Sequence, residues 1–227
     1  MSIPNKLSRP FAWIQPKADP QLIALIEQHG LTMNIKKNSI LAHEGEPPNK
    51  VFLLCSGLCR HTFSQINEST ITISLVLPQR VIGDISILAS HDFFLRFEAI
   101  QASSLKYIPK SLLMRELEND RDFLFKLAAN ITNKHHSYLE GMLCNATLSC
   151  EERLFTLFNV LAQEEGNVIE NGFIQLPIKL SQDIMSEIVS SSRVSINRAI
   201  RRWFVEGVLH KKNGKLWISS NFILKKC

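Results

Sequence analysis

The sequence lacks the features that mark secreted and membrane-spanning proteins. No apolar run approaches the ~18 residues of a membrane span, and the opening residues, MSIPNKLSRPFAWIQPK, lack the uninterrupted apolar core of a secretory signal. The five cysteines are odd in number and irregularly spaced, unlike those of a disulfide framework. These absences predict a cytoplasmic protein in a reducing compartment, without a membrane partner.

Catalytic arrangements are missing as well. We find no set of nucleophile, base and acid, and no glycine-rich loop with a lysine that could bind phosphates. Adjacent residues on a helix point in different directions, so His135 and His136 favour a polar helix surface over a shared metal site. The sequence therefore predicts a protein that is not an enzyme and binds no metal.

The most informative stretch is SQDIMSEIVSSSRVSINRAIRR, residues 181–202. Apolar residues recur at helical spacing on both sides of three serines, which predicts two short helices joined by a tight turn. Ser181 and Ser192 stand where a side-chain oxygen caps the helix that follows. The stretch is thus a candidate helix–turn–helix.

The second of these helices has a basic face. Arg193, Asn197 and Arg201 follow one another at intervals of four residues, and Arg198 and Arg202 flank them. Guanidinium groups can pair with guanine edges or phosphates and asparagine with adenine, so the face fits a DNA groove. The alternative is a solvated basic helix in a helical hairpin.

The residues that follow predict a wing. Asn213-Gly214 lies between two short β-prone runs and is the dipeptide that most readily forms a two-residue hairpin turn. Lys211, Lys212 and Lys215 surround it, where they could reach phosphates. From residue 193 onward the net charge is +8, whereas the preceding 192 residues carry −3. Local basic charge of this kind indicates polyanion binding.

The first half of the chain is β-prone. After an extended segment (1–20) and a short helix (21–30), seven short runs between residues 32 and 108 are separated by Gly, Pro, Asn or Ser. This pattern predicts a compact antiparallel barrel or sandwich.

A long helix is expected from about residue 121 to 146. Spacings of four and three residues alternate along one stripe, which predicts a seam between two helices and favours a homodimer over an intramolecular core helix. The stripe consists of Leu124, Ala128, Ile131, His135, Tyr138, Met142 and Asn145.

This order of elements resembles the Crp-Fnr superfamily of bacterial transcription regulators over residues ~30–220. The resemblance is carried by EGEPPNKVFLLCSG (44–57), RVIGDISIL (80–88) and LPIKLSQDIMSEIVSSSRVSINRAIRRW (176–203). It implies an α+β fold with four parts: an N-terminal segment and helix (1–30), an antiparallel β-roll similar to a cyclic-nucleotide-binding domain (31–109), helices that include the dimerisation helix (110–147), and a winged helix (148–227) with its helix–turn–helix at 181–203 and wing at 208–218.

The resemblance also implies roles for residues of the second helix. It places base contacts on Arg193 and Arg198 and phosphate contacts on Ser192 and Ser195, while the base-contacting Glu of the family falls on Val194. The recognised DNA sequence should therefore differ. The predicted DNA-binding residues are Ser192, Arg193, Val194, Ser195, Asn197, Arg198, Arg201, Lys211 and Lys212.

The ligand site of the family is altered in this sequence. The family binds a cyclic phosphate with a segment after Gly-Glu and with an arginine; here Gly83 is followed by Asp84, and Phe93 replaces the arginine. Arg96 is the only guanidinium nearby. We therefore expect a degenerate pocket that does not bind cyclic AMP in the usual way. Residues 1–54 contain no cysteine, so the iron–sulfur cluster of the Fnr branch is not supported, and no cofactor is expected.

Three functions are compatible with these sequence features. The first is a homodimeric regulator that binds pseudo-palindromic double-stranded DNA and could contact RNA polymerase. The chain as a whole resembles an enterobacterial member that inhibits peroxide resistance, which implies a stress-response role. The second is an antagonist of another regulator or of polymerase, with weak DNA specificity. The third is a ligand-gated or thiol-gated sensor, although Cys55 and Cys59 fit buried strand cysteines better than redox partners.

Overall fold

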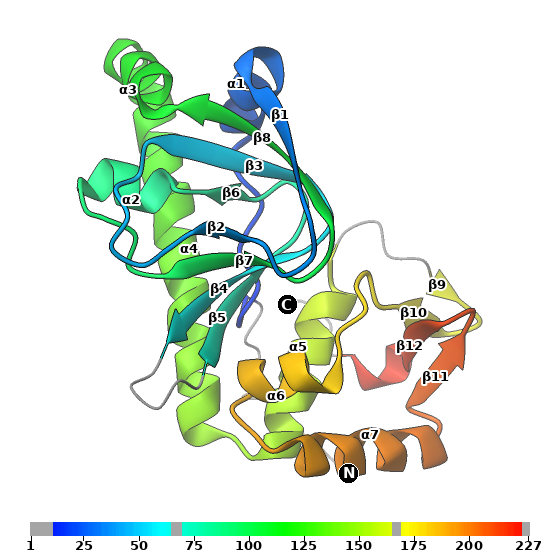
Figure 1. Cartoon of the computed structure of the whole chain (residues 1–227). Helices are drawn as coiled ribbons and strands as arrows, with labels where there is room; N and C mark the ends of the chain where they lie inside the picture. Colours follow the sequence, from blue (N-terminus) through cyan, green and yellow to red (C-terminus); the bar gives the residue numbers. More distant parts are fainter. Residues whose placement is uncertain (1–10, 65–69, 165–168, 224–227) are drawn as a thin grey trace. The chain divides into compact units, whose positions relative to one another are not determined.

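The computed structural model in Figure 1 describes residues 11–64, 70–164 and 169–223. Contacts divide the chain into two compact units. One is Ile14–Tyr138, and the other combines Met1–Trp13 with Leu139–Cys227. The boundary falls inside a long helix, α4 (Arg121–Thr147). Among the described residues, no helix is both long enough and apolar enough to cross a membrane.

The first unit is an antiparallel β-roll of two four-stranded sheets. One sheet has the order β1-β8-β3-β6 and the other β2-β7-β4-β5, and every pairing in them is antiparallel. The strands are β1 (Leu31–Ile35), β2 (Ile40–Ala42), β3 (Lys50–Ser56), β4 (Cys59–Ser64), β5 (Thr70–Val76), β6 (Val81–Ile82), β7 (Arg96–Ala99) and β8 (Ser103–Pro109). The predicted β-roll is confirmed.

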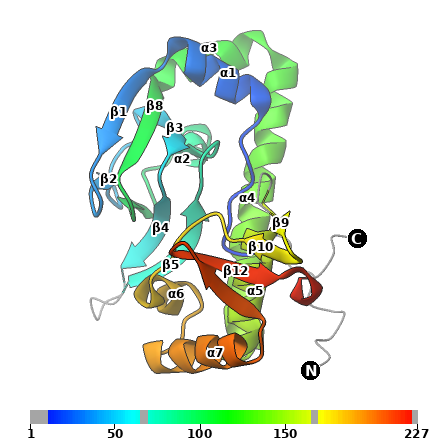
Figure 2. The ribbon, with the colours of Figure 1, turned by 90° about the vertical axis from the view of Figure 1, so that its right-hand side faces the viewer.

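Strand β3 explains why the roll is stable. Successive side chains of a strand point to opposite faces, and here both faces are buried. Val51 and Leu53 pack on one side with α1 (Pro20–His29), α3 (Lys110–Asn119) and the start of α4. Phe52 and Leu54 pack on the other side, inside the roll. Helices α1 and α3 both contact β3 and β8 and lie at one end of the roll (Figure 2).

Two short elements of the roll were not predicted. The β-prone run at residues 32–41 is divided into β1 and β2 by a turn in which Asn38 has a φ of 64°. A helix, α2 (Asp84–Ala89), follows β6 directly and begins after Gly83, whose φ is 97°. A side chain at Gly83 would also collide with the Lys50 carbonyl, because a Cβ there would lie 2.7 Å from that oxygen. Glycine thus allows Asp84 to start the helix.

The second unit is a winged helix. Helix α5 (Cys150–Ala162) starts with a capping box between Ser149 and Glu152, and α6 (Gln182–Ile188) and α7 (Arg193–Val205) follow it. A small antiparallel sheet has the order β11-β12-β10-β9. Its strands are β9 (Ile169–Glu170), β10 (Phe173–Gln175), β11 (Leu209–Lys212) and β12 (Lys215–Ser219), and a short 3-10 helix, η1 (Ser220–Phe222), ends the described chain.

Candidate nucleic-acid interface and predicted nucleotide pocket

The helix–turn–helix has the predicted caps. Ser181 Oγ accepts a hydrogen bond from the Ile184 amide at 3.2 Å, and Ser192 Oγ accepts one from the Ser195 amide at 3.1 Å. Between the helices, Ser190 has a φ of 45°. The serine therefore adopts a left-handed conformation that costs an L-residue some strain.

Helix α7 buries one face and exposes the other. Ile196, Ala199 and Trp203 are buried in the second unit, which fixes the direction of the opposite face. That face carries four exposed residues at spacings of four, three and four: Val194, Arg198, Arg201 and Val205. Asn197 is half-buried beside them. The exposed face is thus rotated by one residue from the predicted line through Arg193, Asn197 and Arg201.

Two arginines of α7 have acidic partners. Arg193 forms an ion pair with Asp183 of α6, although its side chain stays largely exposed. Arg202 pairs with Glu151 of α5, and the same carboxylate accepts a hydrogen bond from Trp203 Nε1 at 3.0 Å. Arg202 therefore attaches α7 to α5. A surface pair such as that of Arg193 is worth little, so a nucleic acid could compete for this guanidinium.

The wing is formed by β11 and β12. Asn213 and Gly214 have φ values of 52° and 74°, the two positive values of a type I′ turn, so the predicted hairpin is confirmed. Lys211 and Lys215 are exposed on it. Lys212 Nζ lies 2.6 Å from Glu170 Oε1 and is partly neutralised. Lys211 is therefore better placed than Lys212 to contact a phosphate.

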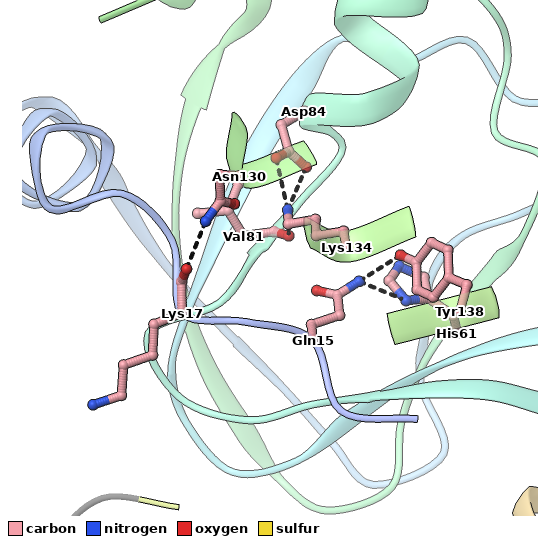
Figure 3. A network of polar contacts seen from close by, with 8 residues as sticks. All are labelled: Gln15, Lys17, His61, Val81, Asp84, Asn130, Lys134 and Tyr138. Carbon is pink, nitrogen blue, oxygen red and sulfur yellow. Dashed lines mark hydrogen bonds and ion pairs between the residues drawn. The ribbon is translucent and has the colours of Figure 1, made fainter. Parts of the chain in front are cut away.

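Asp84, the predicted carboxylate of the nucleotide pocket, is occupied by a partner within its own unit (Figure 3). Lys134 Nζ of α4 donates to Asp84 Oδ1 at 2.8 Å, to Asp84 Oδ2 at 2.6 Å and to the Val81 carbonyl at 2.8 Å. The side chains of Lys134 and Asp84 are only 0% and 2% exposed. All three ammonium protons are thus used, and the carboxylate charge is neutralised without a ligand.

A second polar group involves the N-terminal segment (Figure 3). Gln15 Nε2 donates to Tyr138 Oη at 2.7 Å and to His61 Nδ1 at 3.0 Å. Because the amide nitrogen can only donate, Nδ1 of His61 is the acceptor and the ring is neutral. Burial, and then the charge of Lys134, lower the pKa of His61 well below its usual value. Burial likewise raises the pKa of the Tyr138 phenol.

The same segment is held by its backbone. Ile14 forms a parallel bridge with Leu75 of β5, and the Gln15 amide donates to the Leu75 carbonyl at 3.3 Å. Asn130 Nδ2 of α4 donates to the Lys17 carbonyl at 2.7 Å. Residues 14–17 therefore join β5 to α4 inside the first unit, a role that the prediction of a plain extended segment missed. Residues 1–10 lie outside the described part.

The other predicted pocket residues separate into two groups. Phe93 is buried with Phe97, their ring centroids 5.5 Å apart, and a Cβ on Gly83 would lie 3.8 Å from the Phe93 ring. Gly83, Asp84 and Phe93 thus come together. Arg96 does not join them, because it neighbours Phe97 in β7 and so faces the opposite side of the sheet; its Nη2 donates to Ser64 Oγ at 2.9 Å.

The structure leaves only part of the predicted dimer seam exposed. His135 and Met142 are exposed on α4, and Leu124 is exposed at its start. Tyr138 instead bonds Gln15, and Ile131 packs against the core of the first unit. The exposed heptad shifts by one residue at alternate positions and comprises Phe125, Ala128, Thr132, His135, Leu139, Met142 and Ala146.

The cysteines and possible metal ligands give no further site. Burial raises the pKa of Cys59 to about 11, partly offset by its contact with Ser103. A thiol with so high a pKa is a poor nucleophile. Cys55 is exposed, so the expectation of two buried cysteines is wrong for Cys55. Within the ranges that the structure describes, no group of three or more His, Cys, Asp or Glu side chains could hold a metal ion.

Comparison with known proteins supports the same architecture. Residues 32–120 match the family model of the cyclic nucleotide-binding domain. A protein from Porphyra purpurea, ycf28, named as a transcriptional regulator of the HTH type, is 21% identical over 198 residues, which cover 85% of this chain and 80% of that protein.

Solved structures extend the likeness beyond this domain. FixK2 from Bradyrhizobium japonicum has a TM-score of 0.74 at 18% identity, over 87% of this chain and 99% of FixK2. TTHA1359 from Thermus thermophilus, a transcriptional regulator of the CRP/FNR family, has a TM-score of 0.63 at 19% identity, over 83% of this chain and 93% of that one. The fold is that of the CRP/FNR regulators. The predicted α+β class, with a β-roll, a long helix and a winged helix–turn–helix, is confirmed for this CRP/FNR fold.

Proposed function

We propose that the chain is a DNA-binding transcription regulator of the CRP/FNR type that acts as a homodimer. One observation carries this proposal: the exposed face of α7 presents Arg198 and Arg201, and the wing of the same unit presents Lys211. A helix entering the major groove beside a lysine that contacts the phosphate backbone is the arrangement by which winged helices bind DNA. The net charge of +8 from residue 193 onward would attract the polyanion.

Each part of the proposed interface has a distinct task. The guanidinium groups of Arg198 and Arg201 would contact base edges or phosphates, and Arg193 would join them by leaving Asp183. The hydroxyl groups of Ser192 and Ser195 already bond each other at 2.9 Å, so each can still turn a lone pair or proton toward a phosphate. Lys211 would supply attraction without sequence preference.

The homodimer would use the exposed heptad of α4. Alternating spacings of three and four residues place Phe125, Leu139 and Met142 on one stripe, and all three are more than half exposed. Apolar residues in such a row stay exposed only at a cost, which a second copy of the helix removes. Two-fold symmetry would then present two α7 helices to the two halves of a pseudo-palindromic site.

The first unit supports a regulator that does not depend on a cyclic nucleotide. The carboxylate of Asp84 already has a cation, and Phe93 and Phe97 fill the region where the resemblance placed the phosphate arginine. A cyclic phosphate would have to displace Lys134 or lie unpaired against apolar rings, and both carry a desolvation cost.

The decisive experiment is selection of binding sites from random duplexes by the full-length protein, followed by titration at several salt concentrations. We expect enrichment of a pseudo-palindromic site and a steep, linear fall of log affinity with log salt, because phosphate contacts release counterions. A protein-interaction antagonist would enrich no sequence. Contact with RNA polymerase and a role in peroxide resistance belong to the same proposal, and mapping of occupied promoters in cells before and after peroxide exposure tests them.

A further inference from the structure

The first turn of α7 holds an exposed apolar side chain among basic ones. Val194 is 67% exposed, whereas the apolar face of the helix, with Ile196, Ala199 and Trp203, is buried. The valine therefore contributes nothing to the core of the winged helix. On the exposed stripe it precedes Arg198 by one helical turn.

We propose that Val194 recognises the 5-methyl group of a thymine in each half-site, an inference that rests on the proposed DNA-binding function. The side chain has two methyl groups and neither a donor nor an acceptor, so it cannot pair with the polar edge of a base. In the major groove of unmodified DNA the only apolar edge group is the thymine methyl. Contact between these groups removes apolar area of both from water.

The same position would discriminate against cytosine. Cytosine presents an N4 amino group where thymine presents O4, and it has no methyl group. Covered by Val194, this donor would lose water without gaining an acceptor. The neighbouring groups offer no substitute, since Arg193 and Arg198 are donors and the proposed interface directs the Ser192 and Ser195 hydroxyls to phosphates. Val194 thus favours thymine by one contact and disfavours cytosine by one unpaired donor.

The test starts from the site enriched by selection with the full-length protein. Uracil, which lacks only the methyl group, replaces each thymine in turn in both half-sites, and binding is measured by fluorescence anisotropy. At one thymine position we expect affinity to fall about fourfold per half-site, or about fifteenfold for both, as for the loss of one buried methyl contact each. Cytosine at this position should bind more weakly than uracil, and 5-methylcytosine should recover part of the loss.

Three variants assign the effect to the side chain. Val194→Ala should lose the preference for thymine over uracil while keeping the salt dependence, since no charge is removed. Val194→Glu should shift the preference to cytosine, whose amino group a carboxylate can accept. Val205→Ala, at the other end of the exposed stripe and 88% exposed, is the matched control and should behave as the unmodified protein.

Two results would overturn the inference and are distinct. If a site is enriched but no thymine responds to uracil, or if Val194→Ala keeps the response, DNA binding stands and the role of Val194 does not. If selection enriches no site at all, the proposed function fails and the role of Val194 fails with it.

Discussion

The ion pair between Asp84 and Lys134 gives a test of how the first unit is held together. Both side chains are almost fully buried, and the ammonium group has Asp84 and the Val81 carbonyl as its acceptors. Asp84→Ala would leave a buried cation with one neutral acceptor. Removing one partner of a buried pair costs about 3–5 kcal/mol. This is a large part of the ~5–15 kcal/mol by which a folded domain is stable.

The assay is urea unfolding followed by circular dichroism, because all three tryptophans, Trp13, Trp203 and Trp217, lie outside residues 14–138. With a urea dependence of about 2 kcal/mol per molar, the expected loss lowers the midpoint by roughly 1.5–2.5 M. Hydrogen exchange of the β3 amides would place the loss in the first unit.

Two further variants sharpen this prediction. Asp122→Ala breaks the exposed pair of Asp122 with Lys126 in the same helix and should leave the midpoint unchanged. Replacing both buried partners, Asp84→Leu with Lys134→Met, should recover much of the stability, because apolar side chains of similar volume need no counter-charge. If Asp84→Ala lowers the midpoint no more than Asp122→Ala, the pair does not have the role given to it here.

Four further outcomes are expected. Arg198→Ala should weaken binding to the selected site by about 1–3 kcal/mol and random duplexes less, whereas Lys211→Ala should weaken both alike; equal losses for both variants would remove the base contact from Arg198. Leu139→Glu with Met142→Glu should dissociate the dimer, as measured by light scattering, and lower DNA affinity. The inward-facing Ile131 and Tyr138 cannot serve as such a probe. An unchanged mass would exclude the exposed face of α4 as the dimer interface. The pKa of His61 is lowered on folding, so the unfolded chain takes up a proton near pH 6.5 and the folded chain only at lower pH. The stability contributed by neutral His61 is therefore complete above pH 6.5 and falls as the pH drops below it, by up to ~1.4 kcal/mol per pH unit. In urea titrations at pH 7.5 and 5.5, His61→Gln should show a smaller loss of stability between the two pH values than the unmodified protein, and an equal loss would disprove the assignment. Calorimetric titration with cyclic AMP and cyclic GMP should show no saturable binding below about 100 µM, where the free energy would be near −5.5 kcal/mol, and saturation there would contradict the filled pocket.

The winged helix was predictable because its signals are local. Ser181 and Ser192 cap the helices that directly follow them, and Asn213-Gly214 forms a turn whose geometry only two residues determine. Backbone preferences of this kind act within a few residues and appear in the sequence. The exposed face of α7 is centred on Val194 rather than on Arg193, because the burial of Ile196, Ala199 and Trp203 sets the direction of the opposite face.

Helix α4 shows where sequence patterns fail. Positions 128, 135 and 142 belong to the predicted seam and to the exposed heptad, but the positions between them shift by one residue. The pattern assigned Ile131 and Tyr138 to the seam because they are apolar or aromatic. In the structure, Ile131 packs against the core of the first unit and Tyr138 accepts a hydrogen bond from Gln15. Lys134 lies on the buried stripe of α4 between the apolar residues Leu127 and Cys144, and a lysine in that place was the available signal. The sequence alone does not reveal its role, because its partner Asp84 lies 50 residues away.

The N-terminal segment and Asp84 of the predicted pocket both bond side chains of α4. Gln15 bonds His61 of β4 and Tyr138 of α4, and Lys134 of the same helix bonds Asp84 at the start of α2. The chain's own side chains therefore join the roll to α4. A ligand changes an equilibrium only by binding one state better than the other, and a site whose charges are already paired offers little such difference. The proposed regulator would then respond through its abundance, its partners or its proposed dimer equilibrium.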